Sequence, residues 1–307
     1  MTSLADDVVA PMTAEQRAEF EREGFLVLPG VLSESEVEFY AGALDRVYRA
    51  RRAAGGVAPG GAMHLLSAVA NCPEVIGLID HPRAFSLVWS MLGWNVHIYH
   101  SHLDVHPPIV QRQPFRYEWH QDGGRQNREI ETDPRPRLSV KLAFWLSDVS
   151  QPGRGNFKVW PGSHTRNRID GPPRRDIAWP DPQGAIEVCV NPGDTVFFDR
   201  RLWHARSGNY SQVTRKVVFF GYTLRWIAIR DELEALHASP EFEQLSPVRR
   251  QLLGGIGAGI DGQAGDDHLG CQAGGDHLWG HYPKTTPLYS FLFERGLLDP
   301  ANLPLRG

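Results

Sequence analysis

The chain has 307 residues, of which 41% are hydrophobic and 22% charged, and this balance is typical of a folded globular protein rather than a disordered one. Acidic residues (36) outnumber Lys plus Arg (32), so the net charge of −4 leaves no excess of basic residues for a nucleic-acid partner. Three cysteines without a CxxC pair argue against a zinc–cysteine site, whereas 13 histidines make His and carboxylate the expected ligands of any bound metal.

The N-terminal part of the chain, up to about residue 93, is predicted to be mainly helical with one inserted strand. Thr13 begins a capping box, the pattern that starts a helix, and a second helix is expected to begin at Ser33. Between them, the apolar segment 25–32 is typical of a short buried strand. A further helical region is predicted over 73–93.

From about residue 94 to residue 230 the pattern changes to short segments rich in β-branched and aromatic residues, separated by Gly and Pro turns. Because no helical segments alternate with them, they favour an antiparallel sandwich or jelly roll over a parallel sheet. Two polar inserts interrupt the pattern. The predicted strand segments are 94–106, 137–149, 155–162, 185–199 and 215–226, and the inserts are 123–137 and 165–182.

The last part of the chain is predicted to form loops and a helix. Residues 254–282 are rich in Gly, Asp and His, which indicates a loop, and 287–298 is predicted to form a final helix. No internal repeat divides the sequence, so we expect a single domain over residues 1–307. Its parts are a helical N-terminal region (about 1–93), a β core (about 94–230) and a C-terminal loop and helix region (about 231–307).

One group of residues has the pattern of a metal site. His120 and Asp122 are two residues apart at the end of a predicted strand, so their side chains share one face. His204 follows another predicted strand much further along the chain. Two histidines and one carboxylate on one side of a metal, with the remaining positions open, form the facial triad of non-haem Fe(II) oxygenases.

Arg215 is a candidate for binding a carboxylate near that metal. It follows His204 by eleven residues and begins another predicted strand. A guanidinium binds a carboxylate through two parallel hydrogen bonds. An oxygenase that uses a 2-oxo dicarboxylic acid needs such a group at a fixed distance from the metal, which makes Arg215 the expected partner of the far carboxylate.

Four motifs, in the right order, resemble the phytanoyl-CoA dioxygenase family of Fe(II)- and 2-oxoglutarate-dependent oxygenases, which includes ectoine hydroxylases. The first is the opening helix, strand and second helix over 12–40, and the second is the WHQDGG segment at 119–124. The third ends in PGSH over 142–164, and the fourth is the distal histidine motif over 192–215. The resemblance extends over nearly the whole chain.

The resemblance implies a mainly β fold, a double-stranded β-helix (a cupin-like jelly roll) with flanking N-terminal and C-terminal helices. It implies Fe(II) as cofactor, bound by His120, Asp122 and His204, with 2-oxoglutarate and O2 as co-substrates. Arg215 would bind the C5 carboxylate of 2-oxoglutarate, which is converted to succinate and CO2.

The second contact to 2-oxoglutarate is left open. Ser211 or Ser207 could supply a hydroxyl, and His100, His102 or Lys141 could supply a further polar contact. Family members often carry an HxS sequence after the distal histidine, whereas this chain has His-Ala-Arg-Ser, with Arg206 in the place of that serine.

Three alternatives for the function remain. A carboxylate at Asp122, where related halogenases carry a small residue, favours hydroxylation, desaturation, ring formation or epimerisation over halogenation. A cupin-like isomerase or hydrolase could use the same three ligands without 2-oxoglutarate, but it would have no need of Arg215. A non-catalytic binding module would have no need of the three intact ligands.

The expected setting is a cytoplasmic enzyme that acts on a small molecule. The N-terminus has no leader-like pattern, and no window of about 18 residues is uninterruptedly apolar, so we expect no membrane partner. The style of the sequence suggests a bacterial protein of specialised metabolism. Its oligomeric state and the identity of its substrate are left open.

Overall fold

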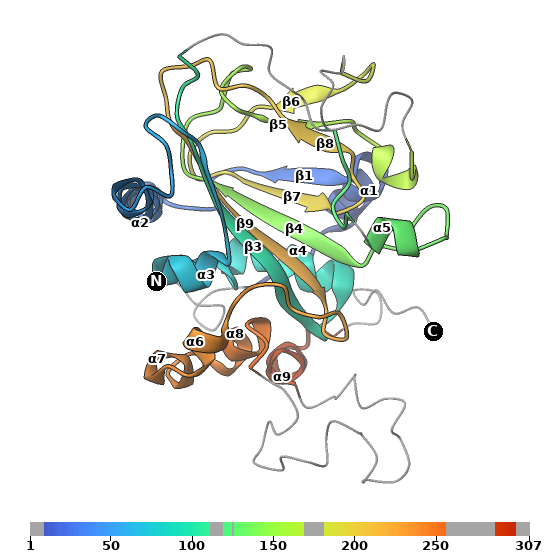
Figure 1. Ribbon diagram of the computed structural model, residues 1–307. Coiled ribbons are helices and arrows are strands. Elements are labelled where there is room, and N and C mark those ends of the chain that lie inside the picture. Colours follow the sequence, from blue (N-terminus) through green and yellow to red (C-terminus); the bar gives the residue numbers. More distant parts are fainter. Residues whose placement is uncertain (1–8, 111–118, 125, 169–180, 256–285, 299–307) are drawn as a thin grey trace.

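The computed structural model describes residues 9–110, 119–124, 126–168, 181–255 and 286–298 of the chain. Figure 1 shows two β-sheets, one above the other, with helices on the far side of the larger sheet and at one end of it. None of the described helices combines the length and the apolar composition needed to cross a bilayer.

The N-terminal segment has the helix–strand–helix order predicted from its sequence. Helix α1 (Ala14–Glu23) begins with the capping box of Thr13 and ends at Gly24, whose φ of 82° lies in the left-handed region that favours glycine. Strand β1 (Phe25–Leu28) follows at once, and helix α2 (Glu34–Ala53) begins at the N-cap Ser33. These predictions are confirmed.

The larger sheet is antiparallel and has the strand order β1-β7-β4-β9-β3-β2. Its long central strands, β3 and β9, pair along nearly their whole length, with His106 opposite Arg215 at one end. Besides β1, its strands are β2 (Met63–Leu66), β3 (Val96–His106), β4 (Ser139–Trp145), β7 (Thr195–Asp199) and β9 (Arg215–Leu224).

The smaller sheet has the order β6-β5-β8, also antiparallel, and lies over one face of the larger sheet (Figure 1). Its strands are β5 (Phe157–Val159), β6 (Ile186–Val188) and β8 (His204–Arg206). Isolated bridges extend it on both sides, including one between His120 and His204. The two facing antiparallel sheets form the predicted jelly roll.

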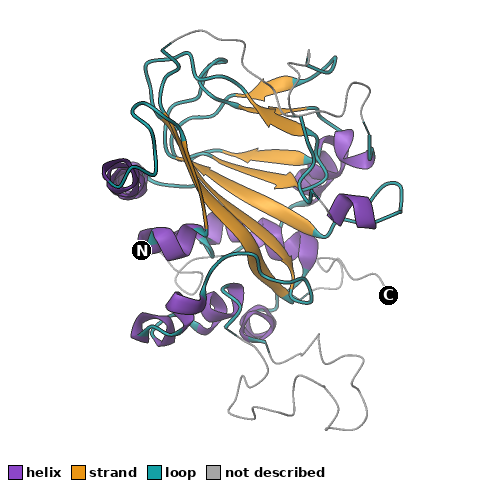
Figure 2. Ribbon diagram, in the orientation of Figure 1, coloured by secondary structure: helices purple, strands orange, loops and turns teal. Residues whose placement is uncertain are grey.

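Helices cover the other face of the larger sheet and its end (Figure 2). Helix α4 (Pro82–Leu92) lies across β4, β7 and β9, and every residue of it except Arg83 is buried. The other helices are short: α3 (Ala68–Asn71), the 3-10 helix η1 (Pro73–Leu78), α5 (Gln126–Glu129), η2 (Ser163–Thr165), α6 (Glu234–His237), α7 (Pro240–Glu243), α8 (Pro247–Leu252) and α9 (Pro287–Glu294).

The larger sheet separates two hydrophobic cores. Successive side chains of a strand point to opposite faces, and β4 follows this rule. Leu142 and Phe144 join the core beneath α4, whereas Ala143 and Trp145 join the core between the two sheets. The second core is the smaller one, and polar groups occupy the rest of that inner face.

Several element boundaries predicted from the sequence differ from those in the structure. The region 73–93, predicted as one helical region, is η1 followed by α4, and the change comes at Asp80-His81-Pro82. Strands β2 and β8, of four and three residues, were not predicted, because segments so short carry no clear alternation. Much of the 254–282 segment lies outside the described residues, and the single domain over residues 1–307 stays a prediction.

We expect Phe20→Ala to lower the free energy of unfolding by about 3–5 kcal/mol. Phe20 is fully buried and stacks on Phe197 of β7, with ring centroids 4.7 Å apart, so its removal leaves a cavity where α1 meets the sheet. Urea denaturation measures the change. The matched control is Phe39→Ala on α2, because that side chain is 42% exposed, and it should cost less than about 1 kcal/mol. Equal losses would contradict this packing.

Candidate metal centre

The three predicted metal ligands come together between the sheets. One ligand atom from each of His120, Asp122 and His204 lies within 4.8 Å of the others. The backbones of the two histidines exchange two hydrogen bonds of 2.9 Å, and their ring centroids are 4.3 Å apart. Asp122 is held by a 2.9 Å hydrogen bond from its N–H to the carbonyl of Arg200. A pairing between distant segments therefore builds the site.

His204 is prepared to bind a metal through one defined nitrogen. Its Nδ1 lies 2.8 Å from the carbonyl of Leu202, so Nδ1 carries the proton and donates it there. The other nitrogen, Nε2, faces Asp122 at 3.9 Å from Oδ2. Burial lowers the pKa of His204 to about 3, and the ring is therefore neutral at physiological pH. A neutral imidazole with a free lone pair is the form that binds metal.

Asp122 is ionised although its side chain is only 16% exposed. Burial would raise the pKa of Asp122, but Lys141 and the two histidines hold it well below its usual range. Lys141 Nζ lies 2.9 Å from Asp122 Oδ2. Burial acts to lower the pKa of Lys141, and the negative charge of Asp122 outweighs it and raises that pKa. A carboxylate and imidazole nitrogens on one side of a common point fit a divalent transition metal.

Arg215 is buried on the same inner face, at the start of β9. Its Nη1 donates to Asp104 Oδ2 at 3.1 Å, and its guanidinium lies 4.9 Å from the ring centre of Trp145. Its Nε is buried without a hydrogen-bond partner among the described residues. Asp104 and Trp145 thus hold the guanidinium in place, and its Nε–H has no acceptor among the described residues.

His102 lies near both Lys141, which contacts Asp122, and Asp104, which contacts Arg215. Its ring stacks on Phe219, with centroids 4.4 Å apart, and is buried. Its pKa is lowered well below the ordinary value, chiefly by burial, and both Asp104 and Lys141 act on it electrostatically. His102 Nδ1 has no hydrogen-bond partner among the described residues. His102 therefore presents an unsatisfied polar atom between the metal ligands and Arg215.

The two candidate serines differ. The Ser211 hydroxyl donates to Asn209 Oδ1 at 2.7 Å, a bond within the turn that follows β8, so this hydroxyl is already engaged. The Ser207 hydroxyl is buried and has no hydrogen-bond partner among the described residues. No bound molecule tests either serine as a co-substrate contact, and both assignments stay predictions.

Sequence reasoning missed the residues around Arg215. Asp104 binds Arg215, and His64 Nδ1 lies 2.7 Å from Asp104 Oδ1. The alternation along β3 could have indicated Asp104, because it shares a face with His102 and His106. Nothing in the sequence pointed to His64, since β2 was not predicted.

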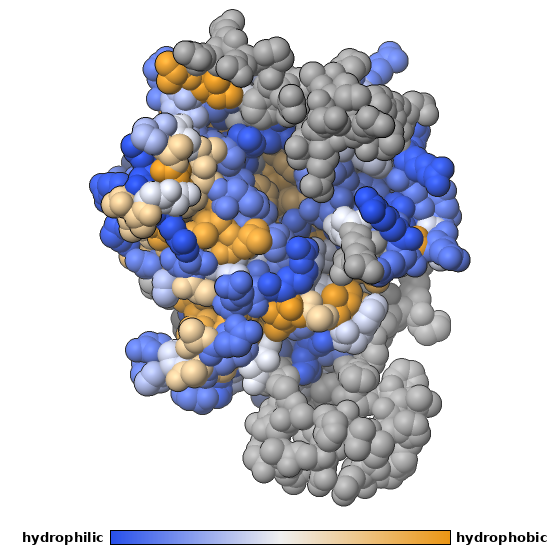
Figure 3. Space-filling view, in the orientation of Figure 1, coloured by the Kyte–Doolittle hydropathy of each residue, from blue (hydrophilic) through white to orange (hydrophobic). Residues whose placement is uncertain are grey.

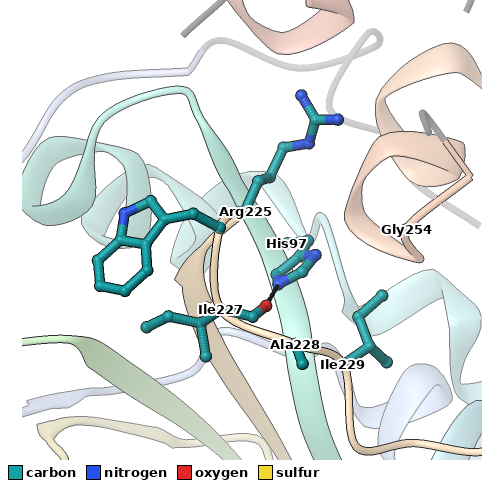
Figure 4. A pocket seen from close by; sticks show the side chains of 7 residues that line it. His97, Arg225, Ile227, Ala228, Ile229 and Gly254 are labelled. Carbon is teal, nitrogen blue, oxygen red and sulfur yellow. Dashed lines mark hydrogen bonds between the residues drawn. The ribbon is translucent and has the colours of Figure 1, made fainter. Parts of the chain in front are cut away.

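The surface around the site has both hydrophilic and apolar parts. On the face seen in Figure 1, hydrophilic side chains surround recessed apolar atoms between the levels of the two sheets (Figure 3). A separate cavity of about 420 Å³ lies where β9 ends, beside His97, the 225–229 segment and Gly254 (Figure 4). His97 Nε2 is bonded there to the carbonyl of Ile227 at 2.8 Å. None of the three metal ligands lines this cavity.

Comparisons with known proteins match the greater part of this chain. The family model described as phytanoyl-CoA dioxygenase (PhyH) matches residues 20–217. An ectoine dioxygenase from Stutzerimonas stutzeri is 25% identical over 239 residues, which cover 69% of this chain and 77% of that protein.

Solved structures confirm the predicted fold class. HygX from Streptomyces hygroscopicus, with nickel and 2-oxoglutarate bound, has a TM-score of 0.56 at 20% identity and covers 71% of this chain and 90% of its own. SnoK, an alpha-ketoglutarate-dependent carbocyclase from nogalamycin biosynthesis, has a TM-score of 0.55 at 23% identity and covers 80% of this chain and 94% of its own. At these sequence identities the similarity supports a shared fold and nothing more.

We expect Lys141→Met to destabilise the metal-free protein by about 3–5 kcal/mol, because it leaves Asp122 buried without its cation. A bound divalent ion supplies the missing positive charge, so the loss should be smaller with Ni(II) than with a chelator. Urea denaturation of wild type and variant under both conditions measures this.

The control for this variant is Lys216→Met. Lys216 pairs with Asp45 at 2.7 Å, but the Asp45 side chain is 42% exposed, so this change should cost less than about 1 kcal/mol under either condition. A loss in Lys141→Met that is the same with and without metal would contradict the role given to Lys141.

Proposed function

This chain belongs to the phytanoyl-CoA dioxygenase family, and from that premise we propose that His120, Asp122 and His204 bind the iron with which it oxidises its substrate. It is an Fe(II)- and 2-oxoglutarate-dependent dioxygenase that acts on a small molecule. The observation that carries the assignment of ligands is the approach of their three ligand atoms to within 4.8 Å of one another.

The bound iron supplies the oxidising chemistry, in which O2 is used, 2-oxoglutarate is decarboxylated to succinate and CO2, and a substrate C–H bond is oxidised. The chain supplies position and charge. The Leu202 carbonyl fixes which nitrogen of His204 faces the metal, and Lys141 keeps Asp122 ionised. His120, Asp122 and His204 would hold the iron as a facial triad, a ligand set that leaves positions for co-substrates.

Arg215 binds the C5 carboxylate of 2-oxoglutarate in this proposal. It lies on the inner face of the larger sheet, and its unpartnered Nε leaves one donor for an incoming carboxylate. His102, on the same face of β3 as Asp104, has a buried Nδ1 without a hydrogen-bond partner among the described residues. The far carboxylate thus meets a positive charge that is already buried and held in place, so little rearrangement is needed on binding.

Hydroxylation of a small molecule is the reaction we propose. Asp122 occupies the position at which a halogenase would need space for chloride, so transfer of oxygen is favoured. A cupin-like isomerase or hydrolase would leave Arg215 without a role. We also propose that the enzyme is cytoplasmic and acts in specialised metabolism.

We expect His120→Ala, Asp122→Ala and His204→Ala each to abolish the conversion of 2-oxoglutarate to succinate, because two remaining ligands hold iron too weakly. Succinate formation under O2 and the iron content of the protein after anaerobic loading measure the two effects separately. The control is His237→Ala, an exposed histidine of α6 that should retain both. Wild-type turnover in any of the three ligand variants would contradict the assignment.

We expect Arg215→Ala to raise the KM for 2-oxoglutarate about 30-fold or more, since truncating one partner of a buried, charge-assisted pair costs about 2–5 kcal/mol. Turnover at saturating co-substrate should be affected much less. Arg215→Lys tests the same point while keeping a charge beside Asp104, because lysine lacks the forked donors. Circular dichroism checks that both variants fold, and an unchanged KM would remove Arg215 from the site.

A further inference from the structure

Five polar side chains form a connected group at the far end of the inner face, and we call them the Asp104 cluster: His64, Asp104, His106, Arg206 and Arg215. Asp104 accepts from Arg215 at 3.1 Å and lies 2.7 Å from His64 Nδ1. His106 Nε2 lies 3.6 Å from Asp104 Oδ2, and His106 Nδ1 contacts Arg206 Nη1. The cluster joins two guanidinium groups through one carboxylate and one imidazole.

Arg206 points toward the same space as the distal metal ligand. It is two residues after His204 in β8, and residues two apart on a strand share a face. The opposite face of β8 at Ala205 packs against Trp119 instead. Arg206 therefore occupies the inward position that, in the HxS sequence of the family, belongs to a serine.

The contact between Arg206 and His106 fixes the direction of the guanidinium. Burial lowers the pKa of His106 to about 4, so the ring is neutral at physiological pH. Its Nδ1 can then accept from Arg206 while Nε2 carries the proton and faces Asp104. His106 is directly opposite Arg215 in the β3–β9 pairing. His106 and Asp104, on one face of β3, therefore connect the two guanidinium groups.

A second metal site is the competing interpretation of this cluster. Ligand atoms of His64, His102 and Asp104 lie within 4.8 Å of one another. However, Arg215 Nη1 is only 3.1 Å from Asp104 Oδ2, and a guanidinium at that distance repels a cation. The cluster holds two permanent positive charges and one carboxylate among its members, which suits an anion.

We propose that Arg206 is a second binding group for the far carboxylate of the 2-oxo acid, beside Arg215, and that Asp104 is the internal counter-ion of this pair of arginines. The proposal rests on the proposed function, because it assumes that the co-substrate binds between the metal and Arg215. In this chain Arg206 places a charged donor where the family has a serine hydroxyl, and Asp104 offsets the added charge.

This arrangement makes the pocket selective for dicarboxylic 2-oxo acids. A 2-oxo acid without the far carboxylate leaves the two guanidinium groups facing an uncharged methyl group. A site whose buried polar groups lose their partner rejects such an analogue strongly. Arg206 should therefore contribute to the preference for 2-oxoglutarate over 2-oxopentanoate, which has the same chain length and no C5 carboxylate.

The test is isothermal titration calorimetry of the full chain loaded with Ni(II), with 2-oxoglutarate and 2-oxopentanoate as the two ligands. We expect Arg206→Ser to raise the Kd for 2-oxoglutarate about 10-fold or more, because a short, neutral hydroxyl replaces the charged donor. The Kd for 2-oxopentanoate should stay unchanged. The matched control is Arg52→Ser, an exposed arginine of α2, which should leave both constants unchanged.

Asp104→Asn tests the counter-ion role, because it keeps the shape and a carbonyl acceptor but removes the charge. We expect the Kd for 2-oxoglutarate to fall several-fold in this variant and to return toward the wild-type value in Asp104→Asn combined with Arg206→Ser. Thermal melting checks that the variants fold. If Asp104→Asn does not fold, Arg206→Ser alone still tests whether Arg206 binds the far carboxylate.

The outcomes separate this inference from the proposed function. If wild type prefers 2-oxoglutarate and Arg215→Ala loses that preference while Arg206→Ser keeps it, Arg206 is not a binding group and the proposed function stands. If Arg206→Ser weakens both ligands equally, its role is structural and the inference is wrong. If wild type does not distinguish the two ligands, the dicarboxylate pocket itself is wrong. A higher Kd in Asp104→Asn would overturn the counter-ion role.

Discussion

Two buried ion pairs on the inner face of the larger sheet govern the arrangement of the whole site. Lys141 pairs with Asp122 and Arg215 pairs with Asp104, and the most exposed of the four side chains, that of Asp122, is 16% exposed. A charge placed there alone would cost several kcal/mol, so each must have its partner and each partner must come from a different segment. The jelly roll satisfies this requirement by bringing β4 beside the metal motif and β9 beside β3.

The polar inner face is possible because the opposite face of the same sheet supplies the hydrophobic core. Leu142 and Phe144 face α4, and Val218 and Phe220 of β9 join them. On the inner side, aromatic rings separate the polar groups: Phe219 stacks on His102, and Trp145 lies under Arg215. Low polarity around the charges strengthens their interactions and lowers the pKa of the buried histidines, which keeps them neutral and able to bind or accept.

The common scaffold therefore fixes the candidate metal ligands more firmly than the proposed co-substrate pocket. The ligands depend on backbone pairing between His120 and His204, which the fold imposes. The far end of the pocket depends on side chains, and this chain uses Arg206 where the family's HxS sequence has serine. Such a change adds a charge, and a neighbouring carboxylate such as Asp104 is the physical means of tolerating it.

The family, the jelly-roll class and the N-terminal helices with their capping box could be predicted from the sequence, and so could His120, Asp122, His204 and Arg215 as candidate site residues. These features rest on local patterns and on motifs in a fixed order, which can be recognised without a structure. The folded chain was needed to show that Asp104 contacts both Arg215 and His64, that Lys141 contacts Asp122, and that Ser211 is engaged in its own turn. Those contacts mostly join residues far apart in the chain. Which residues meet is set by the register of the paired strands, and no local sequence pattern encodes that register.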